Sequence, residues 1–151
     1  MKPFFSGLIL LLASSAPSPA ADLTVVVTGL RSETGIVRVA LFDSEPGFPI
    51  DTSRAVALQQ MDLSVTPTNH PRAVVFKNLP EKTYAVSVFH DEDSDGKLKT
   101  NWLGMPREGV GSSNNAKGRI GPPRFAAAAF PLAGNLWIVV AVTYFWSLTA
   151  N

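Results

Sequence analysis

The chain has 151 residues, with 13 Lys and Arg against 12 Asp and Glu, no Cys, and 46% hydrophobic residues. This length supports one domain with a modest core. The formal charge of +1 gives no strongly basic face of the kind that nucleic-acid binding requires. The lack of Cys excludes disulfides, thiolate zinc sites, iron–sulfur clusters and cysteine nucleophiles.

Residues 1–20 are typical of a secretory signal peptide. A positive residue precedes a ten-residue apolar run at 4–13, which is too short to cross a bilayer as a helix. Small residues then follow, with Ser18 and Ala20 at the two key positions of a signal-peptidase site. The sequence predicts export to the periplasm or the medium, a single domain at 21–151, and no membrane span once the signal is removed.

Beyond the signal, the chain shows the alternation of apolar and polar residues that is typical of β-strands. Such alternation covers 23–28 and 37–42, and the short Gly-containing turn between these runs predicts a β-hairpin. Further strands are expected at 73–76 and 83–89. The segment 52–60 is expected to form a helical turn or an irregular edge.

The end of the chain combines a short expected strand at 126–132 with a 13-residue apolar run at 136–148. This run is rich in β-branched and aromatic residues, which favours one long strand. Its apolar residues fall on both faces, so the strand is either central or exposed and adhesive. Short strands separated by Gly- and Pro-containing turns predict an all-β fold, an antiparallel β-sandwich.

The segment 91–124 has a different character. It holds six of the 11 Gly and three of the 12 Pro, with little apolar periodicity. Long loops inside compact domains are more often functional than structural. The sequence therefore predicts one long Gly- and Pro-rich loop that binds a ligand.

Two stretches carry a family resemblance. The segment 76–98 contains a strand, a Leu-Pro turn and Tyr-x-Val-x-Val in order, which resembles transthyretin-like (prealbumin-like) sandwiches. More specifically, GLRSETGIVRVALFDSEPGFP and SSNNAKGRIGPPRF resemble an uncharacterised secreted bacterial family, domain of unknown function two-one-four-one. The resemblance covers 22–130. It implies a prealbumin-like β-sandwich and an exported protein, and it brings no established activity.

An acidic motif opens the 91–124 segment. Asp91, Asp93 and Asp95, with a Gly directly after them, have the spacing of the first half of a calcium loop. Lys97 would add its backbone carbonyl as a further ligand. The Glu expected at the last position of such a loop is missing, so the alternative is a solvated acidic turn. The sequence predicts a weak Ca²⁺ site or such a turn.

The rest of the segment is basic, since residues 97–124 include six Lys and Arg and one Glu. Asn114, Asn115, Lys117 and Arg119 are candidate ligand-binding residues in this stretch. Their amide and cationic groups could bind an anion or a sugar, and the neighbouring Gly residues let backbone N–H groups approach it. The alternative is a salt-bridged cap in which this basic stretch folds over the acidic motif.

The positions of the two histidines do not indicate a catalytic site. By its spacing, His90 lies at the end of a core-facing row, and His70 is expected to be solvated. No catalytic triad or metallo-hydrolase set is apparent, so an enzyme is not expected, and one for an anionic or sugar substrate is the least favoured hypothesis. The sequence predicts an exported, non-catalytic protein that binds an unknown ligand or ion through 91–124. The alternative is a structural or adhesion module that self-associates through the apolar strand 136–148.

Overall fold

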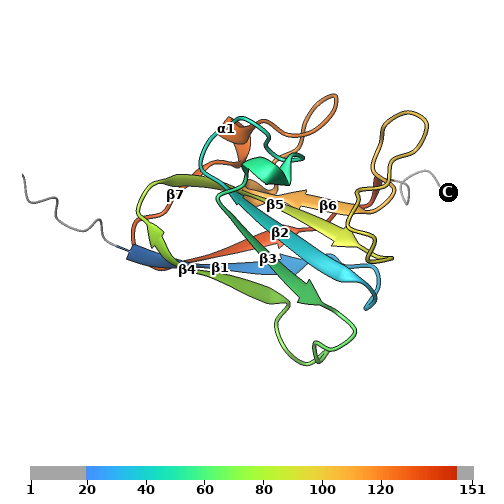
Figure 1. The fold of residues 1–151 in the computed structure, drawn as a ribbon, viewed down its shortest axis with the longest axis horizontal. Coiled ribbons are helices and arrows are strands. Elements are labelled where there is room, and N and C mark those ends of the chain that lie inside the picture. Colours follow the sequence, from blue (N-terminus) through green and yellow to red (C-terminus); the bar gives the residue numbers. More distant parts are fainter. Residues whose placement is uncertain (1–19, 146–151) are drawn as a thin grey trace, which may run out of the picture.

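The computed structural model describes residues 20–145, which form two packed β-sheets (Figure 1). The smaller sheet has the order β4-β1-β8, and the larger has the order β3-β2-β5-β6, with β7 pairing beside the start of β5. In chain order the strands are β1 Ala20–Thr28, β2 Ile36–Phe42, β3 Ala57–Asp62, β4 Ala73–Pro80, β5 Thr83–Asp91, β6 Gly109–Ser112, β7 Phe130–Pro131 and β8 Leu136–Ala141. The predicted all-β sandwich is confirmed.

Strand pairing is antiparallel throughout both sheets except between β1 and β8, which run parallel. The predicted hairpin between 23–28 and 37–42 is wrong. β1 pairs with β4 and β8, whereas β2 pairs with β3 and β5, so the turn at 29–35 crosses from one sheet to the other. Alternation specifies which face of a strand is apolar. It does not specify which sheet the strand joins, because the apolar faces of both sheets pack into the same core.

The segment 52–60, expected as a helical turn or an irregular edge, contains a 3₁₀ turn, η1 (Thr52–Arg54), followed by most of the edge strand β3. Another element differs from the expectation. The expected strand at 126–132 is instead a single helical turn, α1 (Phe125–Ala128), followed by the two-residue β7. Alanine favours helix, which explains the turn. The strand expected at 136–148 ends at Ala141, and residues 146–148 lie outside the described range.

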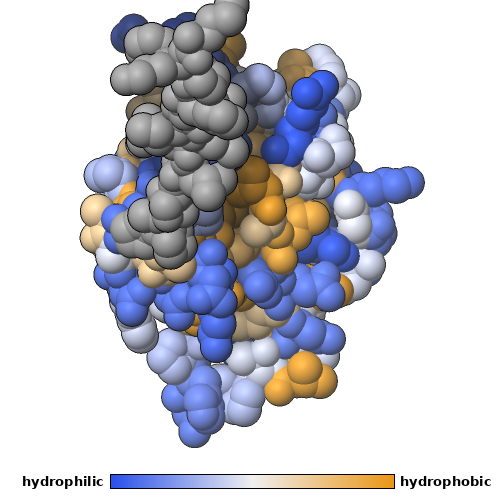
Figure 2. Space-filling view, turned by 60° about the vertical axis from the view of Figure 1, so that its left-hand side comes forward, coloured by the Kyte–Doolittle hydropathy of each residue, from blue (hydrophilic) through white to orange (hydrophobic). Residues whose placement is uncertain are grey.

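The core lies between the two sheets and is built from alternate residues of their strands. Both layers contribute, with Leu23, Val25, Val37, Val39, Leu41, Phe76, Tyr84, Val86, Val88 and Val140 nearly or fully buried. Burying one such side chain contributes roughly 1.5–3 kcal/mol. On the face shown in Figure 2, a hydrophobic patch near the centre borders hydrophilic residues below it and to its right. Among the described residues, no helix is long and apolar enough to cross a membrane.

The segment 91–124 is not one long loop. It contains β6, which pairs with β5, and a second 3₁₀ turn, η2 (Ser113–Asn115). The Gly-rich sequence of β6 has a packing reason: a Cβ at Gly109 would overlap the Tyr144 ring, and one at Gly111 would lie 2.7 Å from the Ala141 carbonyl oxygen. Two loops remain, the first loop (92–107) and the second loop (116–124). Both rise on the same side of the larger sheet in Figure 1.

Candidate functional site

A buried carboxylate anchors the start of the first loop. Asp91, the last residue of β5, is fully buried and accepts hydrogen bonds from Arg38 Nε at 2.8 Å, Gly96 N at 2.9 Å and Asp95 N at 3.1 Å. Burial raises the pKa of Asp91, but the hydrogen bonds from Arg38 and from the backbone of Gly96 and Asp95 hold it below its usual range. Asp91 therefore stays ionised and folds the turn that follows β5.

A second buried carboxylate anchors the other end of the first loop. Glu108 directly precedes β6 and is buried. Its two oxygens accept hydrogen bonds from Glu92 N at 3.1 Å and Lys99 N at 3.0 Å. Glu108 is not among the predicted site residues; its one signal in the sequence is that it is the single acidic residue of the basic stretch 97–124. Asp91 and Glu108 together hold the loop in one conformation.

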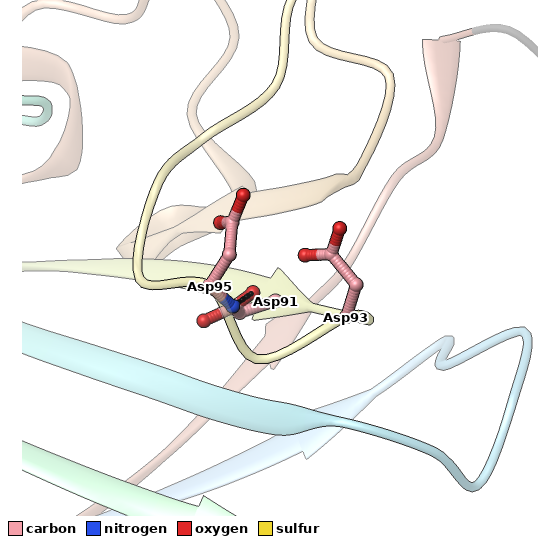
Figure 3. Close-up of side chains that lie close together, drawn as sticks. All are labelled: Asp91, Asp93 and Asp95. Atoms are coloured by element: carbon pink, nitrogen blue, oxygen red, sulfur yellow. Dashed lines mark hydrogen bonds between the residues drawn. The ribbon is translucent and has the colours of Figure 1, made fainter.

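The spacing of the acidic motif does bring its three carboxylates together. Asp91, Asp93 and Asp95 each place one carboxylate oxygen within 4.8 Å of the others, at the turn after β5 (Figure 3). Lys99 forms ion pairs with Asp93 and Asp95, and Arg38 pairs with Asp91. The three carboxylates are therefore paired with two cations within the protein, and Ca²⁺ binding stays a prediction.

The predicted seventh-position residue, Lys97, sits on the same turn. Its backbone N–H donates to Asp95 Oδ1 at 2.8 Å, which closes a small Asx turn. Its side chain is exposed and forms no ion pair with any residue of the described range 20–145. The Lys97 cation therefore faces solvent beside the acidic turn.

The tip of the first loop presents large apolar side chains to solvent. Trp102 is 89% exposed, Leu103 61% and Met105 39%. The tip is nevertheless ordered by hydrogen bonds, because Asn101 Oδ1 accepts from the backbone N–H groups of Leu103 and Met105 at 2.9 and 3.0 Å. Gly104, with φ +76°, closes this turn onto the Asn101 carbonyl. This exposed apolar tip was not predicted from the sequence.

The second loop forms a basic hollow. Lys117, Arg119 and Arg124 line an open surface depression of about 430 Å³ together with Ile120, whose side chain is fully exposed. The loop is tightly folded, since a Cβ at Gly118 would collide with backbone carbonyl oxygens across the loop. The three cations form no ion pair with any residue of the described part of the chain. The salt-bridged cap over the acidic motif is therefore limited to Lys99 of the first loop.

The two asparagines of the predicted ligand loop lie in η2 and bind backbone groups. Asn114 donates from Nδ2 to the carbonyl oxygens of Ala127 and Ala129, at 3.3 and 3.0 Å. Asn115 Oδ1 accepts from Ala141 N at 3.0 Å, at the end of β8. Of the four residues predicted for this loop, Lys117 and Arg119 line the hollow, and the two asparagines position the chain that leads into it.

The histidine at the end of β5 is a structural link. His90 is buried, with Nδ1 2.6 Å from the Tyr144 hydroxyl and Nε2 2.8 Å from the Thr34 carbonyl oxygen. Arg31 stacks over the Tyr144 ring and forms an ion pair with Glu92. Burial raises the pKa of the Tyr144 hydroxyl, so it stays protonated. Both ring nitrogens of His90 are occupied by these contacts.

A known protein family matches most of this chain. A family described as "uncharacterized protein conserved in bacteria (DUF2141)" matches residues 25–137. The chain belongs to this family. No match was found among curated proteins or among solved structures. The DUF2141 range contains both loops and both anchoring carboxylates, and its description names no activity.

In this DUF2141 protein the two loops define what the site can do chemically. The acidic groups are buried or paired, while apolar tips and unpaired cations point outward. This arrangement can attract an anion and cover apolar surface at the same time. We call the exposed surface of the first and second loops the loop face.

Proposed function

We propose that this protein is a non-catalytic binding module that engages an anionic partner through its loop face. The observation that carries the proposal is the basic hollow of the second loop, where Lys117, Arg119 and Arg124 gather without acidic partners in the described range. Lys97 adds an exposed cation on the first loop that forms no ion pair with any residue of 20–145. Unpaired cations that converge raise the local concentration of anions.

The loop face is preformed, which supports a binding role. Asp91 and Glu108 hold the first loop by its two ends, and Asn101 holds its tip. A binding surface that is already ordered loses less conformational entropy when its partner arrives. The signal-like segment 1–20 supports action in the periplasm or the medium as part of the same proposal.

A non-catalytic role is proposed from the surroundings of the two histidines. The ring nitrogens of His90 bind Tyr144 and Thr34, and His70 Nδ1 lies 2.9 Å from the Asn69 side chain. Neither histidine lines the hollow of the second loop. General acid–base catalysis requires a titrating group within reach of the substrate, and these histidines are placed elsewhere.

The test is a titration with pyrophosphate, followed by amide chemical shifts in NMR. We expect saturable shifts at the amides of Gly118 and Ile120, and their loss in the double variant Lys117→Gln/Arg119→Gln. The matched control is Lys77→Gln, because Lys77 is exposed on β4 of the other sheet and forms no ion pair within residues 20–145. Shifts that are absent, or that Lys77→Gln removes equally, would contradict the proposal.

A second candidate function, a structural or adhesion module, is favoured by the position of β8. This strand is the last of the smaller sheet, and Trp137 and Val139 on its outer side are 72% and 57% exposed. Edge strands with apolar residues pair readily with another copy of the chain. Sedimentation velocity tests this: concentration-dependent dimers that Val139→Lys abolishes would support it, and a monomer at every concentration would exclude it.

A further inference from the structure

We propose that the anionic partner is the surface of a phospholipid bilayer that contains anionic lipids. This inference rests on the proposed function and names its partner. The tip of the first loop and Ile120 of the second loop would enter the headgroup region, while Lys117, Arg119 and Arg124 bind lipid phosphates.

A small soluble anion as the partner would not account for the exposed apolar side chains at the tips of the two loops. Trp102, Leu103 and Ile120 are 89%, 61% and 100% exposed, and they stand at the ends of the two loops. Contact with a small anion would leave these side chains in water. Tryptophan is enriched at the level of lipid headgroups, where its amphipathic ring is stable, and aliphatic side chains favour the adjoining acyl region.

The cations lie where anionic headgroups would meet them. Lys97 lies on the first loop before its tip, and the three cations of the second loop line its hollow. Arg107, after the tip, lies beside Glu92, Asp93 and Glu108. Clusters of Lys and Arg beside inserted apolar residues are attracted to anionic lipids. The nearby aspartates are paired within the protein, Asp93 and Asp95 with the single cation of Lys99 and Asp91 with Arg38. The net positive charge therefore lies on the second loop, where residues 116–124 include three cations and no acidic residue.

The shape of the loop face suits a fluid surface. Both loops project on the same side of the larger sheet in Figure 1, as two separate points. Projecting points need no complementary groove in the partner, because lipids rearrange around them. The Asn101 turn and the close backbone contacts at Gly118 keep the two tips ordered, so insertion requires little further ordering of the chain.

The experiment uses the tryptophans of the chain as reporters. Tryptophan occurs at positions 102, 137 and 146. The variant Trp137→Phe/Trp146→Phe keeps only Trp102 at the loop tip, and the variant Trp102→Phe/Trp146→Phe keeps only Trp137 on the outer side of β8. Each is mixed with vesicles of phosphatidylcholine alone or of phosphatidylcholine with phosphatidylglycerol. Both variants share the same N-terminus, so any contribution of residues 1–20 is common to both.

We expect the emission of Trp102 to shift to the blue, and its quenching by acrylamide to fall, only with phosphatidylglycerol present. Trp137 should not respond. Trp102→Ala should weaken vesicle binding roughly tenfold, as expected for one large apolar side chain. Removing each of Lys117 and Arg119 should weaken it about fivefold, the effect of one charge near an anionic surface. Lys77→Gln should leave binding unchanged.

Each contrary result has a definite meaning. Pyrophosphate shifts without any vesicle response would overturn the lipid inference and leave the proposed function standing, and the absence of both would overturn both. Equal responses of Trp102 and Trp137 would show adsorption that does not involve the loop face. A Trp102 response to a single-stranded oligonucleotide but not to vesicles would assign a different partner and also overturn the inference.

Discussion

Replacing Asp91 by Asn tests the claim that a buried carboxylate organises the first loop. The substitution keeps the size of the side chain and removes its charge. In the native protein the carboxylate accepts three hydrogen bonds, from Arg38 at 2.8 Å, Gly96 N at 2.9 Å and Asp95 N at 3.1 Å. The amide has one oxygen instead of two, so part of this set of donors loses its acceptor.

The expected cost follows from these contacts. A hydrogen bond to a charged group contributes about 1.5–3 kcal/mol, and removing one partner of a fully buried ion pair costs roughly 3–5 kcal/mol. The Arg38 side chain is 35% exposed and can be solvated after the change, which places the effect below that range. We expect Asp91→Asn to lower the free energy of unfolding by about 2 kcal/mol. For a domain of this size the melting temperature should fall by roughly 8 °C.

Thermal and urea unfolding measure this loss, with Asp93→Asn as the matched control. Asp93 lies on the same turn and makes an ion pair, but its side chain is 45% exposed. Its substitution should change stability by no more than about 0.5 kcal/mol. Hydrogen exchange should show faster exchange of the Gly96 amide in Asp91→Asn only.

The pH dependence of the same variant provides an independent check. The pKa of Asp91 is lower in the folded protein than in the unfolded chain. Its contribution to stability is therefore fully present above the unfolded pKa, about 3.9, and is lost as pH falls through the folded pKa. The stability gap between the wild type and Asp91→Asn should be constant near neutral pH and should close below about pH 4. Equal losses of stability in Asp91→Asn and Asp93→Asn would refute the reasoning. A stability gap between the wild type and Asp91→Asn that stays the same below about pH 4 would also refute it.

Three further predictions concern other parts of the chain. Ser113→Ala should cost about 2 kcal/mol in urea unfolding, because this buried hydroxyl joins the backbone of β5 to that of α1; a loss near zero would contradict it. Millimolar Ca²⁺ should raise the melting temperature relative to chelator, more so in Lys99→Gln, which frees two carboxylates, and not in Asp93→Asn/Asp95→Asn; equal wild-type values would exclude the site. Intact-mass measurement of exported protein should place the N-terminus at Ala21, and retention of the preceding residues would count against export.

The sequence by itself predicted four of the strands. The apolar and alternating patterns at 23–28, 37–42, 73–76 and 83–89 are local properties, and β1, β2, β4 and β5 cover these segments. The convergence of the three aspartates was also predictable, because they are separated by single residues on one turn. Short-range geometry limits where such side chains can lie.

Only the tertiary structure decided which strands become partners. The turn at 29–35 joins two sheets instead of one hairpin, and this choice depends on β4 and β8, which lie far along the chain. Composition likewise favoured a loop at Gly109 and Gly111, where the close approach of β8 and Tyr144 requires glycine in a strand. Such contacts depend on segments that are remote in the sequence, so no local pattern records them.

At the loop face, too, the sequence shows some features and only the tertiary structure decides the others. Charges at 97–124 are visible in the sequence, but their pairing is not. Arg38 reaches Asp91 because β2 pairs with β5 in a particular register, and Glu108 binds the first loop because β6 returns beside β5. Trp102 would ordinarily be expected in a core, and only the packed sandwich shows that it lies outside. Exposure is a property of the whole fold, because it depends on what every other segment covers.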